Sequence, residues 1–167
     1  DWPASTILAA RRQLSWPVGG GKTALDWRGI RHHLAVREVL MLWGNRAARL
    51  PSWFTQLFHS TYRLTRLFSA QMPAATGLQP LPNGRDDVLV SVPERALLEM
   101  LSDAGKGQSL QEAKQIVESP AGQRSRVLDS LLAQTTRVKV IRLAHALAAR
   151  TGQPWADVAA THNKRLA

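Results

Sequence analysis

The clearest periodic pattern in the sequence lies in its last third. Across residues 137–151, apolar side chains recur every three or four positions, while three cations fall on a different face: Lys139, Arg142 and Arg150. This spacing predicts an amphipathic helix. Gly152 follows the pattern and Pro154 lies just beyond it, an order that is typical of a helix end.

In the second half of the chain, three further helices are predicted before this one. Residues 124–135 place four apolar side chains on one side: Val127, Leu128, Leu131 and Leu132. Residues 91–101 begin with Ser91 and Glu94, at the S-x-x-E spacing of a capping box, with a proline between them that a first helical turn tolerates. A second box of the same spacing opens residues 109–118. The second half of the chain is therefore expected to be mainly helical.

Short strands are expected among helices in the first half. The continuous apolar run at 38–43 predicts a strand that is covered on both faces. Residues 61–68 alternate imperfectly, as a half-exposed strand does. Asn83-Gly84 predicts a hairpin turn, with residues 87–90 as the return strand. Helices are expected at residues 3–13, at residues 22–34 and from Leu50 onward.

These elements predict an α+β fold, in which a small mixed β-sheet with flanking helices is followed by a C-terminal helical cluster. Residues 1–90 would form the α/β part and residues 91–167 the helical part of the same domain. A length of 167 residues suits a single domain. The chain opens with Asp1 and an apparent helix, which we interpret as a piece of a longer protein.

Composition excludes several classes of function. The chain has no cysteine, which removes disulfides, thiolate metal sites and cysteine nucleophiles. No apolar run approaches the ~18 residues of a membrane span, and no signal peptide is present. We therefore expect a cytoplasmic protein that makes no membrane contact.

The net charge of +10 is rich in arginine. Guanidinium groups favour planar, bidentate partners such as phosphate, and a cationic surface attracts nucleic acid in a salt-dependent way. The charge therefore favours contact with nucleic acid, although an ordinary solvated surface would carry the same cations.

A glycine-rich segment, Gly19-Gly20-Gly21-Lys22-Thr23, has the look of a phosphate-binding loop but lacks its spacing. That loop requires a glycine five residues before Gly21, and Trp16 occupies the position. A turn before a helix explains the segment better.

Four blocks of sequence, in order, resemble the C-terminal domain of the AbiEi family of bacterial antitoxins. The most recognisable block is Val-Ser-Val-Pro-Glu-Arg-Ala-Leu-Leu-Glu-Met-Leu at residues 90–101. The other blocks are residues 20–25 with Gly29, residues 50–53 with Leu67-Phe68, and residues 138–143 with Trp155. Asn163-Lys164-Arg165 replaces the glycine-lysine-arginine that closes the family pattern, and the family's N-terminal winged helix-turn-helix is absent from this chain.

The resemblance implies an antitoxin of a bacterial toxin–antitoxin, abortive-infection system that represses its own operon. Such a protein neutralises a nucleotidyltransferase toxin without forming a stable complex with it. The winged helix would read operator DNA, while the present domain would be needed for antitoxicity and would assist DNA contact. No cofactor, metal or catalytic residue is implied, so the chain is expected not to be an enzyme.

Six cations are our candidates for contact with nucleic acid: Lys139, Arg142, Arg150, Lys164, Arg165 and Arg95. The three on residues 137–151 share one helix face, and Lys164 and Arg165 follow nearby in the sequence. A structural interpretation competes for Glu94 and Arg95, in which the glutamate caps its own helix and the arginine forms an ion pair.

Two alternatives from other classes stay open. A metal-dependent nuclease would use Asp86, Asp87 and Glu112 as metal ligands, with Lys114 beside the scissile phosphate. Capping explains Glu112 better, and a solvated turn explains the two aspartates. A stand-alone DNA-binding regulator would need an element of this chain that can enter the major groove.

Overall fold

A computed structural model gives the fold of most of the second half and of parts of the first. The described residues are 18–19, 40–44, 49–64, 66–73, 75–80, 89–104, 113–114, 117–118 and 122–167. The helices expected at 3–13 and 22–34, the turn at Asn83-Gly84 and the capping box at 109–112 lie outside them.

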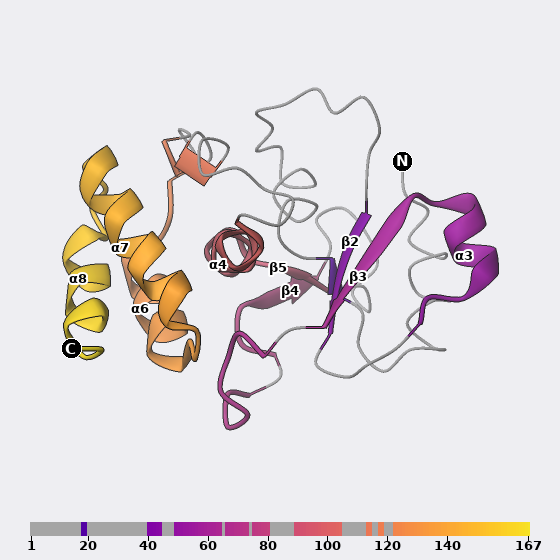
Figure 1. Ribbon diagram of the computed structural model, residues 1–167, viewed down its shortest axis with the longest axis horizontal. Helices are drawn as coiled ribbons and strands as arrows, with labels where there is room; N and C mark the ends of the chain where they lie inside the picture. Colours follow the sequence, from indigo (N-terminus) through magenta and orange to yellow (C-terminus); the bar gives the residue numbers. More distant parts are fainter. Residues whose placement is uncertain are drawn as a thin grey trace.

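The strands form one mixed five-stranded sheet in the order β3-β2-β1-β5-β4 (Figure 1). Their bounds are Val18–Gly19 for β1, Leu40–Gly44 for β2, Ser60–Leu64 for β3, Leu78–Pro80 for β4 and Leu89–Ser91 for β5. The β2–β3 and β1–β5 pairs are parallel, while the β1–β2 and β4–β5 pairs are antiparallel. This confirms the small mixed sheet that the sequence predicts.

The β2–β3 end of the sheet packs against a short helix, α3 (Ser52–Leu57). Leu42 of β2 and Phe54 of α3 are fully buried and form the centre of a small hydrophobic cluster. Phe54 also packs edge-on against the ring of Trp53. The strand and the helix predicted here are both confirmed, although the strand predicted at 61–68 ends at Leu64.

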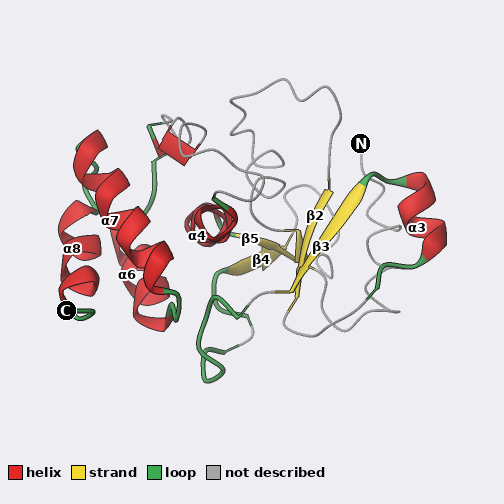
Figure 2. Cartoon of the chain, viewed as in Figure 1, coloured by secondary structure: helices red, strands yellow, loops and turns green. Residues whose placement is uncertain are grey.

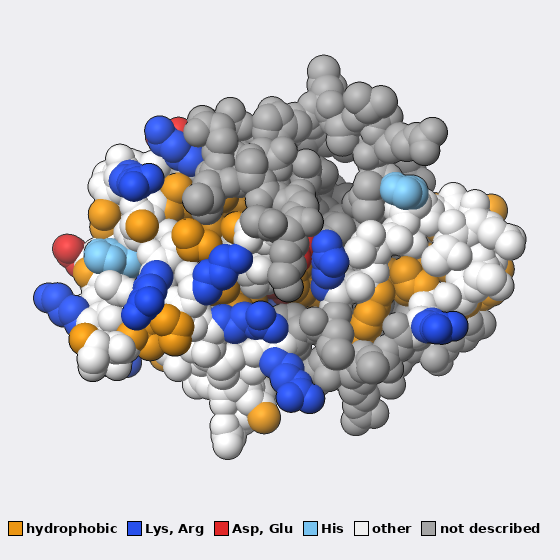
Figure 3. Space-filling model, viewed as in Figure 1, with side chains coloured by type: hydrophobic (Ala, Val, Ile, Leu, Met, Phe, Trp, Pro, Cys, Tyr) orange, Lys and Arg blue, Asp and Glu red, His pale blue; other side chains and the backbone are white. Residues whose placement is uncertain are grey.

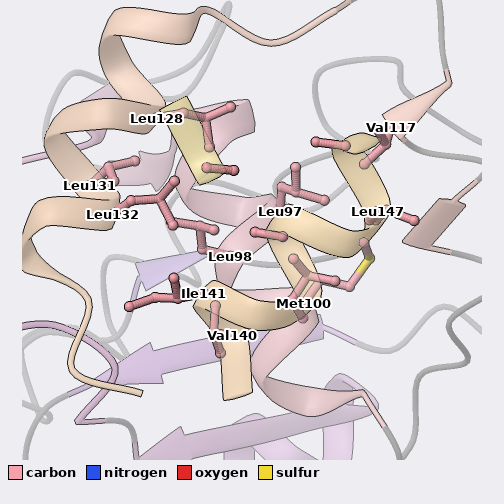
Figure 4. Close-up of a cluster of buried hydrophobic side chains, with 14 of the residues drawn as sticks. Leu97, Leu98, Met100, Val117, Leu128, Leu131, Leu132, Val140, Ile141 and Leu147 are labelled. Atoms are coloured by element: carbon pink, nitrogen blue, oxygen red, sulfur yellow. The ribbon is translucent and has the colours of Figure 1, made fainter. Parts of the chain in front are cut away.

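The remaining helices form the larger part of the core. They are α4 (Pro93–Asp103), α6 (Ser125–Gln134), α7 (Val138–Thr151) and α8 (Ala156–Lys164). Figure 2 shows α4 between the sheet on one side and the α6–α8 layer on the other. Apolar side chains of α4, α6 and α7 point toward one another in a single buried cluster (Figure 4). The fold is α+β, as the sequence predicts.

Three elements were not predicted. Val18–Gly19 is a central strand rather than part of a turn. The antiparallel partner of the return strand β5 is β4, whose Leu78 pairs with Ser91, and not the strand at 61–68. Helix α8 follows Pro154 where no helix was expected.

The prediction that Ser91 and Glu94 form a capping box is wrong. Helix α4 begins at Pro93, its N-cap residue is Val92, and no side chain caps it. Ser91 instead ends strand β5, so its hydroxyl lies one residue too early to reach the first turn. Both polar side chains are buried and have partners farther along the chain.

Candidate nucleic-acid interface

The positive charge of the second half is concentrated in the last three helices. Residues 122–167 carry eight lysines and arginines against two aspartates. All eight cations are exposed: Arg124, Arg126, Arg137, Lys139, Arg142, Arg150, Lys164 and Arg165. Figure 3 shows Lys and Arg side chains gathered over this helical layer. Most acidic residues of the second half lie before residue 122. The net charge of the whole half therefore understates how positive its last three helices are.

Helix α7 separates its side chains as its sequence pattern predicts. Its buried side is apolar, with Val140, Ile141, Ala144, Leu147 and Ala148 in the core. Its exposed side carries Val138, Lys139, Arg142, Ala146, Ala149 and Arg150, with no acidic residue. Two alanines between the arginines leave room for a rod-shaped partner to lie close to the helix.

The turn after α7 brings the end of α8 back toward the start of α7. Gly152 ends α7 in the left-handed conformation at φ 63°, which glycine adopts without strain. Helix α8 then packs against α7 and runs back along it (Figure 1). Lys164 and Arg165 therefore lie toward the end of the hairpin from which Lys139 and Arg142 project. Arg150 lies about 12 Å farther along α7, eight residues beyond Arg142.

Lys139 also has a structural role. Its ammonium donates a hydrogen bond of 2.5 Å to the carbonyl oxygen of Ala104, the C-cap residue of α4. Helix α4 has no basic residue of its own in its last turn. A cation at a helix C-terminus is favourable because the last carbonyls are unpaired and the helix dipole is negative there. Lys139 is thus engaged in the fold, while Arg142 and Arg150 form no ion pair with a described residue.

Arg95 lies away from this surface. Its Nε donates to Glu99 at 3.0 Å, another guanidinium nitrogen donates to the carbonyl of Thr76 at 2.7 Å, and the group lies over the ring of Phe68. Its side chain is only 12% exposed. These contacts support the structural interpretation, so we leave Arg95 out of the candidate interface.

The acidic groups beside it are also committed to the fold. The hydroxyl of Ser91 donates to both carboxylate oxygens of Glu99, which is fully buried. Glu94, which is 2% exposed, accepts hydrogen bonds from the backbone and the guanidinium of Arg124 at 2.8 and 2.9 Å. Arg124 is the N-cap residue of α6, which has no acid in its first turn. Glu94, which lies in the first turn of α4, therefore also supplies negative charge to the start of α6.

Arg124 shifts the titration of Glu94. Burial alone would raise the pKa of this carboxyl group, but the hydrogen bonds from Arg124 and from the backbone of Glu94 itself, together with the positive charge of Arg124, outweigh burial. The net result is a pKa below 4.5. In return, the hydrogen bond to Glu94 raises the pKa of Arg124.

This shift predicts an acid-sensitive component of stability. Because the carboxyl pKa is lowered in the folded state, its contribution is present above the unfolded pKa and is lost as the pH falls through the folded value. The free energy of unfolding of Glu94→Gln should therefore be below that of the wild type at neutral pH, with a gap that narrows below pH 4.5. Urea unfolding at several pH values measures the gap. A constant gap would contradict the assignment.

His162 is a buried polar residue that the sequence did not single out. It is 4% exposed, on α8, and its Nε2 lies 2.6 Å from a carboxylate oxygen of Asp129 on α6. This contact joins two helices of the layer. It also engages Asp129, one of the two acidic residues that the layer contains. The spacing of the histidines gave no signal for it, because the partner lies on another helix.

Comparison with known proteins identifies the family. The family described as a transcriptional regulator, the AbiEi antitoxin of type IV toxin–antitoxin systems, matches residues 37–166. The chain belongs to this family. The family that the sequence blocks indicate is thereby confirmed, and three of the four blocks lie within the matched residues.

One solved structure supports the fold. The crystal structure of the RV2827C protein from Mycobacterium tuberculosis is similar with a TM-score of 0.60 and 14% sequence identity. The alignment covers 95% of this chain and 55% of that one, so the chain spans about half the length of that protein. At this identity the likeness concerns the fold alone. No curated protein matches the chain significantly.

The most recognisable AbiEi block, residues 90–101, has a clear structural role. It supplies the last residues of β5, the start of α4 and the buried groups Ser91, Glu94 and Glu99. Through Arg124 it also fixes the beginning of α6. The block joins the sheet to the helical layer.

The residues of the nuclease alternative are only partly described. Asp86, Asp87 and Glu112 lie outside the described residues, and Lys114 is 3.9 Å from Glu118 on its own helical turn. Within the described ranges, no cluster of three or more His, Cys, Asp or Glu could hold a metal ion. None of the helices described is long and apolar enough to cross a membrane.

Proposed function

We propose that this chain is the antitoxicity domain of a type IV antitoxin and that the exposed cations of α7 and α8 contact nucleic acid. We define this basic face as Lys139, Arg142, Arg150, Lys164 and Arg165. The protein would repress its own operon through a winged helix-turn-helix outside this chain. It would counteract a nucleotidyltransferase toxin without stable binding and without catalysing a reaction.

The family match over residues 37–166 is the observation that carries the proposal. The charge distribution supports the nucleic-acid part. The cations of α7 and α8 project from a layer whose own two acids are Asp129 and Asp157, and the first of these is engaged by His162. Arginine on a rigid helix suits phosphate, because its guanidinium is always charged and binds bidentately.

A co-expression experiment tests the antitoxin role. We expect the full protein to restore growth of cells that express the nucleotidyltransferase encoded by the neighbouring reading frame. The purified chain should bind duplex DNA weakly and without sequence preference. Arg142→Ala with Arg150→Ala should reduce the dependence of log K on log salt by about 1.8, since each lost phosphate contact contributes about 0.9.

The control is Arg49→Ala, which removes an exposed cation that lies outside the α7–α8 hairpin. Its salt dependence should equal that of the wild type. Normal growth rescue with unchanged DNA binding in the double variant would remove the basic face from the mechanism and leave the antitoxin role. A failure to rescue by the folded wild type would contradict the antitoxin role itself.

A further inference from the structure

A short backbone pairing brings two arginines that are far apart in sequence together beside the start of α7. The segment after β3 forms an antiparallel bridge with the link between α6 and α7, pairing Phe68 with Thr135. Continuing this register by two residues places the backbone of Arg66 across from that of Arg137. Both arginines are exposed.

Hydrogen bonds fix this short two-stranded ribbon. The amide of Ser69 donates to the carbonyl of Gln134 at 2.7 Å, and the amide of Thr136 donates to the carbonyl of Leu67 at 2.8 Å. The hydroxyl of Thr136 also donates to the carbonyl of Arg66 at 2.6 Å. The backbones that carry the two arginines are therefore held in place on both sides of the ribbon.

Placing two arginines across from each other is energetically unfavourable unless a group of opposite charge lies between them. Like charges directly across a strand pair repel each other and destabilise it. Neither Arg66 nor Arg137 forms an ion pair with an acid among the described residues. An anion between the two guanidinium groups would replace the repulsion by two charge-assisted hydrogen-bonded contacts.

The pair continues the basic face rather than standing apart from it. Arg137 is the N-cap residue of α7, and the exposed cations of that helix follow directly. From Arg137 to Arg150 the helix rises about 20 Å. This corresponds to about six base pairs of B-form duplex, at 3.4 Å per pair.

The chemistry of this track favours a duplex over a single strand. Single-strand binders combine cations with exposed aromatic rings on which bases stack. In the described part of the hairpin and ribbon, Trp155 is fully buried and Phe68 is half-buried under Arg95. These two rings offer no platform for base stacking, so the described cations of this track suit the backbone phosphates of a partner.

We propose that Arg66 and Arg137 together form a phosphate-binding subsite for the backbone of a nucleic-acid duplex, at the end of the α7 track. This inference rests on the proposed function and adds to it Arg66, from outside the helical layer, and Arg137, at the start of α7. Arg66 lies on the segment after β3, so the subsite exists only where that segment is docked against the α6–α7 link.

The test compares Arg66→Ala, Arg137→Ala and the double variant with the wild type, using the full chain and a short labelled duplex. Fluorescence anisotropy over a range of salt concentrations gives the affinity and its salt slope. We expect the double variant to bind roughly tenfold more weakly and to lose about 1.8 from the slope. The charge-preserving double change to lysine should keep the slope. Arg49→Ala is again the charge control.

Stability measurements separate this role from a structural one. Removing one of two facing cations should leave the melting temperature of the free protein unchanged or higher. The rise in melting temperature on adding duplex should be smaller in the double variant than in the wild type. If the double variant proves unfolded, the two single variants are compared with the wild type instead. Each single variant should lose about 0.9 from the salt slope.

Three outcomes would overturn the inference, and they differ in what else they affect. Wild-type binding with equal affinity and slope in the double variant removes the subsite but leaves the proposed function. Tighter binding to oligo-dT than to duplex refutes the choice of partner. No binding to either nucleic acid, but binding to poly-glutamate, would refute the subsite and the nucleic-acid role together and assign the face to an acidic protein.

Discussion

Changing Arg124 to alanine is expected to lower the free energy of unfolding by about 3 kcal/mol. The change leaves the carboxylate of Glu94, which is 2% exposed, without the guanidinium that pairs with it. Breaking a buried ion pair by removing one partner usually costs about 3–5 kcal/mol. We place the loss at the lower end because Arg124 is 59% exposed and the solvent screens its charge.

Arg126→Ala is the matched control. It removes the same side chain two residues later, from an exposed position without an ion pair among the described residues. Its effect should stay within about 0.5 kcal/mol. Adding Glu94→Gln to Arg124→Ala should recover part of the loss, because the uncompensated charge is then gone. Equal effects of the two arginine changes in urea unfolding would refute the role given to Arg124.

The helices that the sequence predicts well are those whose signals are local. Helix α7 has an apolar face at helical spacing, and Gly152 permits the left-handed conformation that ends it. Helix α6 likewise buries three of the four apolar residues that marked its inner side. In both cases the pattern that predicts the helix lies within the helix or directly beside it, so the prediction needs no knowledge of the rest of the chain.

The capping box at Ser91 shows where local reading fails. The pattern S-x-x-E satisfies two backbone amides if the serine is the N-cap residue, but here the helix begins later, at Pro93. The two side chains bond to Glu99 and Arg124 instead. A distance of thirty residues separates Glu94 from Arg124, and no spacing rule covers such a pair.

The missed elements are short and depend on neighbours. Strand β1 has two residues, one of them glycine, and is a strand only because β2 and β5 flank it. Strand β4 ends in Pro80, a residue that lowers any strand prediction but is tolerated at a sheet edge. Helix α8 follows Pro154 closely and buries only two of its residues, so its amphipathic pattern is weak.

The sequence predicts which cations of α7 are exposed, but not which other residues adjoin them. The cationic side of α7 follows from helical periodicity. Lys139 could not be recognised as a partner of Ala104 from the sequence, because the contact joins α7 to the end of α4. The Arg66–Arg137 pair is also invisible in the sequence, since its two members meet only through the ribbon.

The stability of this fold and the position of the basic face depend on the same contacts, which lie at the two ends of α4. Residues 90–101 tie the sheet to α6 through Glu94, and α7 returns to the end of α4 through Lys139. The cations of α7 and α8 are thus carried by a layer that is fixed at both ends of α4. A change that loosens the layer should therefore reduce nucleic-acid binding without removing any cation.

Trp155→Ala should give the second large effect, a loss of about 3–5 kcal/mol. Trp155 is fully buried in the main core at the start of α8, and its indole N–H donates to the side chain of Gln123, just before α6. The change leaves a cavity between α6 and α8 and an unpaired amide oxygen. Thermal unfolding should show a fall in Tm of about 6–20 °C, at about 2–4 °C per kcal/mol for a chain of this size.

Trp155→Phe separates packing from the hydrogen bond. It keeps most of the ring volume, so it should cost roughly 1–2 kcal/mol, mainly through the lost bond to Gln123. Because Trp155 anchors α8, the alanine variant should also bind duplex more weakly at temperatures near its Tm, while binding well below that temperature stays normal. Reduced binding well below the Tm would contradict this expectation, because it would mean that loss of the buried indole displaces the cations of α8 in the folded protein.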